Sequence, residues 1–82
     1  MTAKEMFEEL GYILTRFESN NFCRWQYDKK TILKNSDIRR QVIWFDFNTK
    51  ELYIHNSITL EELKAINQQC KELGWEVVDE TN

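Results

Sequence analysis

Hydrophobic and polar positions follow a helical period near both ends of the chain and a strand period between them. The apolar positions that recur with helical spacing are Ala3, Met6, Phe7 and Leu10 near the start, and Leu60, Leu63, Ile66, Cys70 and Leu73 near the end. Spacings of three and four residues place such side chains on one helical face. The pattern therefore predicts two amphipathic helices, over residues 3–10 and 60–73.

Both predicted helices begin and end with the same signals. Thr2 and Thr59 are each followed three residues later by glutamate, which is the capping-box pattern of a helix start. Gly11 and Gly74 each stand between a leucine and an aromatic residue. A glycine in this place adopts the left-handed conformation that ends a helix.

Alternation of apolar and polar residues between the helices indicates β-strands. Four runs are strand candidates, at residues 12–17, 22–27, 39–47 and 52–55. Residues 28–37 are mostly polar and form either a long hairpin loop or a short extra strand. Residues 75–78 are a candidate for a short fifth strand.

The predicted order of elements is α-β-β-β-β-α with short connections. This favours an α+β fold: an antiparallel meander of about four strands, with the N-terminal and C-terminal helices packed on one face. Both helices then bury their apolar faces on the same sheet surface. A chain of 82 residues without proline or a linker is expected to form a single domain, residues 1–82.

Composition points to a folded, cytoplasmic protein. The chain is 41% hydrophobic and 30% charged, which is typical of a globular domain. Cys23 and Cys70 are too few for a disulfide framework, and free cysteines on apolar stripes fit a reducing compartment. No apolar run is long enough to predict a signal peptide or a membrane span.

The sequence offers no recognisable catalytic or metal-binding set. His55 is the sole histidine, and Gly11 and Gly74 are the only glycines. These counts leave no histidine-pair zinc site and no glycine-rich phosphate loop. We therefore expect no enzymatic activity, no cofactor and no metal.

One candidate binding site comes from the strand alternation. If Ile43 and Phe45 face the helices, then Phe22, Arg24, Arg40 and Trp44 point to the opposite face of the sheet, together with Val42 and Gln26. Aromatic residues and arginine form protein–protein hot spots, and they also bind single-stranded nucleic acid by stacking. A third interpretation is structural, with the rings covering a thin sheet and the arginine stems lying over them.

Charge is distributed unevenly along the chain. Residues 21–50 carry seven basic and three acidic residues, whereas residues 51–82 carry two basic and seven acidic ones. The acidic balance of the helical ends favours a protein partner over nucleic acid. Self-association through the same face is a further possibility, and no feature predicts membrane binding.

The two ends of the chain carry a resemblance. Residues 1–12 (MTAKEMFEELGY), 58–67 (ITLEELKAIN) and 72–75 (ELGW) resemble a group of small proteins of unestablished function encoded by phages and prophages of Gram-positive bacteria. The similarity is confined to the capped helices and carries over no functional residue. It implies an accessory protein that acts inside a bacterial cell by binding a host or phage protein.

Overall fold

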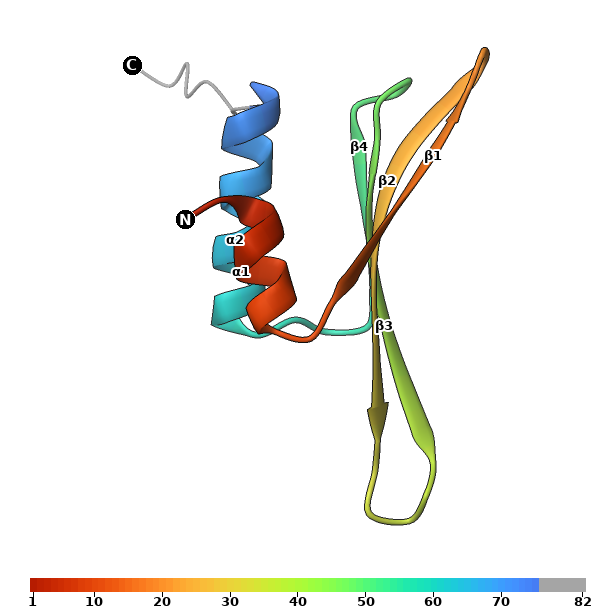
Figure 1. Cartoon of the computed structure of the whole chain (residues 1–82), viewed down its shortest axis with the longest axis vertical. Helices are drawn as coiled ribbons and strands as arrows, with labels where there is room; N and C mark the ends of the chain where they lie inside the picture. Colours follow the sequence, from red (N-terminus) through yellow and green to blue (C-terminus); the bar gives the residue numbers. More distant parts are fainter. Residues whose placement is uncertain (76–82) are drawn as a thin grey trace.

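A computed structural model describes residues 1–75 of the chain (Figure 1). The elements are α1 (Ala3–Glu9), β1 (Ile13–Ser19), β2 (Phe22–Ile32), β3 (Ile38–Asp46), β4 (Glu51–His55) and α2 (Leu60–Leu73). The strands form one antiparallel sheet in the order β1-β2-β3-β4, and both helices lie on one face of it (Figure 1). The predicted α+β meander is confirmed. Beyond Trp75, the candidate fifth strand falls outside the described residues.

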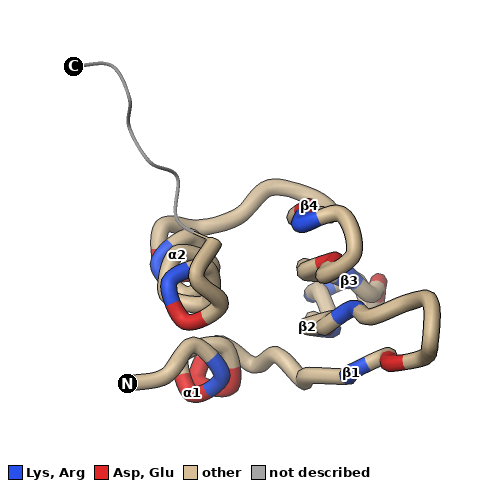
Figure 2. Tube along the Cα trace, turned by 90° about the horizontal axis from the view of Figure 1, so that it is seen from above, with Lys and Arg blue, Asp and Glu red and all other residues tan. Residues whose placement is uncertain are grey.

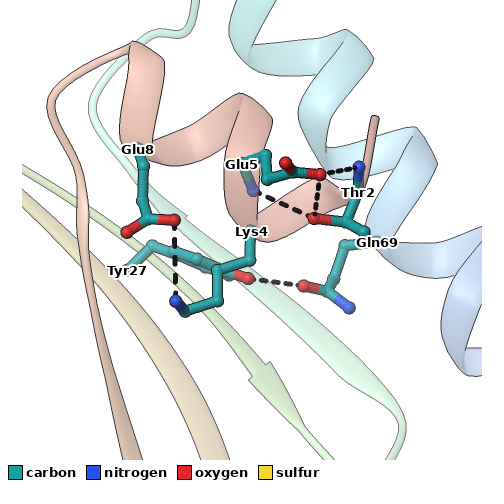
Figure 3. A network of polar contacts seen from close by, with 6 residues as sticks. All are labelled: Thr2, Lys4, Glu5, Glu8, Tyr27 and Gln69. Atoms are coloured by element: carbon teal, nitrogen blue, oxygen red, sulfur yellow. Dashed lines mark hydrogen bonds and ion pairs between the residues drawn. The ribbon is translucent and has the colours of Figure 1, made fainter.

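Both helices start with the predicted capping boxes. The Thr2 hydroxyl accepts the Glu5 amide at 3.2 Å, and the Glu5 carboxylate accepts the Thr2 amide at 2.9 Å (Figure 3). Thr59 and Glu62 repeat this exchange, at 3.1 and 2.7 Å. Each cap satisfies amides that have no partner within the helix, which is why these short segments begin at a defined residue.

Both helices also end as predicted. The glycine that follows each helix has a positive φ, 94° after α1 and 74° after α2. The next amide then turns back onto the helix: Tyr12 donates to the Phe7 carbonyl at 3.0 Å, and Trp75 donates to the Cys70 carbonyl at 2.8 Å. These are Schellman endings, and they direct an aromatic side chain back towards the helix that has just ended.

The core lies between the sheet and the two helices. Its fully buried members are Phe7, Tyr12, Tyr27, Ile43, Phe45, Ala65 and Ile66. Phe7 of α1 stacks on Tyr27 of β2 with ring centroids 3.9 Å apart, and its edge contacts Tyr12 at 5.4 Å. Burial of each large side chain stabilises the fold by about 1.5–3 kcal/mol, so these rings hold the layers together.

The buried face of α2 differs from the predicted stripe. The hydrophobic spacing predicts Leu60 and Leu63 in the core, but they are 63% and 41% exposed. Glu62 and Gln69 are buried instead, beside Ala65 and Ile66. The cause is the pair of buried tyrosines, because each buried hydroxyl needs a hydrogen-bond partner.

Two polar contacts provide these partners. The Tyr12 hydroxyl donates to a Glu62 carboxylate oxygen. The Tyr27 hydroxyl donates to Gln69 Oε1 at 2.6 Å, a contact that Figure 3 shows. Both contacts link the sheet side of the core to α2. The α2 helix is therefore rotated towards its polar residues, a preference that the hydrophobic spacing alone does not reveal.

Residues 28–37 continue the β2–β3 hairpin. Strand β2 runs on to Ile32, and residues 33–37 form the loop, which the Leu33 amide closes by donating to the Asp37 carbonyl at 2.8 Å. The outermost pair of the ladder is Ile32 opposite Ile38. This far half of the hairpin extends beyond the ends of the helices (Figure 1).

Candidate functional site

The helices leave one face of the sheet uncovered. No element of residues 1–75 lies against this face, which we call the outer face (Figure 2). Strand pairing brings three rows together there: Phe17, Arg24, Asp46 and Glu51; Thr15, Gln26, Trp44 and Tyr53; and Ile13, Asp28, Val42 and His55. The predicted assignment of strand faces agrees with this pairing, since the intervening residues Tyr27, Ile43 and Phe45 are in the core.

Arg24 is the centre of a group of aromatic rings on the outer face. Its guanidinium carbon lies 4.3 Å from the ring centre of Trp44, 5.1 Å from that of Phe22 and 5.2 Å from that of Phe17. Cation–π contacts of this kind are worth about 0.5–1 kcal/mol when exposed and more when desolvated. Arg24 Nε is buried in the group and has no hydrogen-bond partner among residues 1–75.

A second aromatic contact extends the group across the sheet. Trp44 and Tyr53 stack with ring centroids 4.0 Å apart and planes inclined by 18°. We call Phe17, Phe22, Arg24, Trp44 and Tyr53 the aromatic–arginine cluster. Its phenylalanine and tyrosine rings are 37–41% exposed, so a partner could contact them without any rearrangement of the sheet.

Arg40 lies on the outer face but outside the cluster. Its guanidinium donates to Asp28 Oδ1 through Nη2 at 2.8 Å and through Nε at 3.1 Å. It also borders a shallow pocket of about 230 Å³, together with Trp44 and His55. The structure thus brings Phe22, Arg24 and Trp44 together as one group and places Arg40 in a separate ion pair beside it.

The sequence pattern does not predict Phe17, Tyr53 and His55 as members of the candidate site. Phe17 lies opposite Arg24, Tyr53 opposite Trp44, and His55 opposite Val42. Strand alternation predicts the faces of β2 and β3, but it does not give their register with β1 and β4. Register depends on the two-residue turn at 20–21 and on the turn at 47–50, so it could not be read from alternation alone.

Charge on the outer face is balanced. Its charged residues are three basic ones (Arg24, Lys30 and Arg40) and three acidic ones (Asp28, Asp46 and Glu51). A phosphate backbone is bound mainly by an excess of basic groups. The face therefore matches a neutral or mixed-charge surface better than a polyanion.

Residues 1–75 contain no group of three histidine, cysteine or acidic side chains placed to hold a metal ion. Cys23 and Cys70 are free and half-buried, and burial raises the pKa of the Cys70 thiol. None of the helices described is long and apolar enough to cross a membrane.

Comparison with known proteins identifies no relative. No protein-family model matches the chain, and no curated protein or solved structure shows significant similarity to it.

Proposed function

We propose that this chain is a small interaction module that binds another protein through the outer face of its sheet, without catalysing a reaction. The observation that carries the proposal is the aromatic–arginine cluster on a face that no described element covers. Tryptophan, tyrosine and arginine supply most of the binding energy in protein interfaces. A polar surface without a partner seldom gathers them in one place.

The two ends of the chain resemble phage and prophage proteins. This resemblance supports an accessory role in the bacterial cytoplasm, with a host or phage protein as the partner. The balanced charge of the outer face supports a protein partner over single-stranded nucleic acid, which remains the alternative because Arg24 and Trp44 offer a stacking surface.

Affinity purification from a Gram-positive host, with wild-type protein and Trp44→Ala as bait, tests the proposal. Trp44→Ala should weaken binding of a specific protein partner by about 2 kcal/mol or more, as expected for a hot-spot residue. Leu60→Ala is the matched control, since Leu60 is an exposed apolar residue on the helix layer. Circular dichroism must show that both variants are folded.

Salt separates the two candidate functions. Protein binding through the cluster should persist when the salt concentration rises from about 50 to about 200 mM. Over the same range, the affinity of a nucleic-acid binder falls by orders of magnitude. Binding that collapses over this range would favour the nucleic-acid alternative. If folded Trp44→Ala and Arg24→Met both retain every partner at wild-type affinity, the outer face is not the interface.

A further inference from the structure

A pocket of about 290 Å³ opens on the helix side of the sheet, away from the outer face. Its lining residues come from the far half of the β2–β3 hairpin and from the segment that leads into the start of α2. Its polar lining residues are Lys29, Thr31, Arg39, Gln41, Ser57, Thr59 and Glu62. Strand pairing places Lys29 opposite Gln41. The next pair on the same face is Thr31 opposite Arg39.

Gln41 carries the strongest sign of a missing ligand. The residue is only 5% exposed and lines the pocket, yet its Oε1 has no hydrogen-bond partner among residues 1–75. Its Nε2 donates to the Asn56 carbonyl at 3.5 Å, which identifies Oε1 as the unpaired end of the amide. A buried acceptor without a partner costs free energy, so this oxygen calls for a group that donates an O–H or N–H.

The pocket also carries a positive charge. Lys29 and Arg39 are its basic residues, and Glu62 is its one acidic residue among the lining positions described. The Glu62 oxygens already accept the Thr59 amide at 2.7 Å and the Tyr12 hydroxyl. The positive end of the α2 dipole adds to the excess of basic charge, because Thr59 at the helix N-cap is part of the wall.

We propose that this pocket binds a small phosphomonoester that bears a hydroxyl group, such as a polyol phosphate. Lys29 and Arg39 hold the phosphate through charge-assisted hydrogen bonds. Two basic groups and the Glu62 carboxylate leave the pocket with a net charge of +1, and Lys29 Nζ lies 5.5 Å from the ring centre of Tyr12. Gln41 Oε1 is closed to solvent in the structure, so the Gln41 amide turns towards the pocket and this oxygen then accepts the ligand hydroxyl. The volume is at the low end for ligand pockets, which restricts the ligand to a small molecule. The proposal is independent of the outer face, since none of these groups belongs to it.

Titration of ¹⁵N-labelled full-length protein with three probes tests the proposal. The probes are glycerol 3-phosphate, inorganic phosphate and glycerol. We expect glycerol 3-phosphate to bind at least about tenfold more tightly than inorganic phosphate, a factor that corresponds to 1.4 kcal/mol. Glycerol alone should not bind. The shifted amide signals should be those of the pocket walls, around Thr31, Arg39 and Ser57. Shifts that spread equally over Lys64 and Lys71 on α2 would overturn the proposal.

Substitutions test which residues contact the hydroxyl group of the ligand and which contact its phosphate. Gln41→Met has a similar volume and no acceptor, so it should abolish the preference for glycerol 3-phosphate while leaving inorganic phosphate unaffected. Arg39→Met should weaken both phosphate probes, whereas Lys30→Met, its matched control on the outer face, should weaken neither. If Gln41→Met retains the full preference, the proposed hydroxyl contact is wrong. If Arg39→Met and Lys30→Met behave alike, the phosphate does not bind in this pocket.

Discussion

The polar atoms of the core decide how α2 is oriented. Tyr12 and Tyr27 bury their rings beside Phe7, and each hydroxyl donates to a polar side chain of α2. Burial is the main cause that raises the pKa of Tyr12, and the hydrogen bond to Glu62 raises it further. Burial raises the pKa of Tyr27 to about 12. Both hydroxyls therefore remain protonated donors over the physiological range, and the two links between sheet and helix persist there.

Glu62 should make the free energy of unfolding depend on pH in the acidic range. Burial alone would raise the pKa of Glu62, but the hydrogen bonds from Tyr12 and Thr59 lower it below its ordinary value of 4.5. A carboxyl with a lowered pKa in the folded state contributes stability above its unfolded pKa, and this stability is lost as the pH falls through the folded pKa. The contribution of Glu62 should thus decline as the pH falls below about 4.5 and be lost once the pH is below the folded-state pKa.

We predict that Glu62→Gln reduces the loss of unfolding free energy on acidification from about pH 6 to pH 3, relative to wild type. Urea denaturation at each pH measures the difference. Glu61→Gln is the matched control, because Glu61 is the preceding residue of α2 and is exposed. Equal acid sensitivity of wild type and Glu62→Gln would show that the Tyr12–Glu62 contact does not distinguish the two protonation states.

Among the secondary-structure elements, the helices are determined mainly by their ends. α1 has only seven residues and would not form alone, so its cap, its Schellman ending and the packing of Phe7 must act together. α2 has fourteen residues and the same signals. Each ending needs a residue at positive φ, for which glycine is the least strained choice.

Gly74→Ala should destabilise the protein by about 1–2 kcal/mol, because a left-handed conformation is strained for any residue with a Cβ atom. A Cβ at this position would meet no heavy atom within 4 Å, so the cost is purely conformational. Gly74→Asn should cost less, since asparagine tolerates this conformation better. Thermal unfolding compares the two variants, and a Gly74→Ala protein as stable as wild type would contradict the Schellman ending.

At the scale of the whole molecule, the two faces of the sheet differ in what covers them. The helices cover one face (Figure 2). The other face keeps Phe17, Phe22 and Tyr53 of the aromatic–arginine cluster exposed. Phe45 and Trp44 are neighbours on β3 but belong to different faces: Phe45 is fully buried, whereas Trp44 is half-buried beside Arg24 and Tyr53. Their contributions to stability should differ accordingly.

Phe45→Ala should cost about 3–5 kcal/mol, because it leaves a cavity in the core. That is a large share of the total stability of a small domain. Trp44→Ala should cost clearly less, since part of the ring faces solvent. Urea denaturation of the two variants measures both values. If Trp44→Ala is as destabilising as Phe45→Ala, the outer face is a second core surface rather than a binding surface.

Local signals in the sequence predicted much of this arrangement. The T-x-x-E starts and the glycine endings fixed both helix boundaries to within a residue, because caps involve residues only a few positions apart. Alternation assigned Phe22, Arg24 and Trp44 to the same face, since successive side chains of a strand point to opposite sides. These conclusions need no knowledge of which strands are neighbours.

Tertiary structure alone decided the rest. The membership of Phe17 and Tyr53 in the cluster depends on register, and the exposure of Leu60 and Leu63 depends on how the buried tyrosines rotate α2. The pocket at Gln41 brings together hairpin residues and the N-terminus of α2, which are separated in sequence. Such relations arise when distant segments pack, so the sequence by itself determined the elements and their faces, and packing determined which side chains meet.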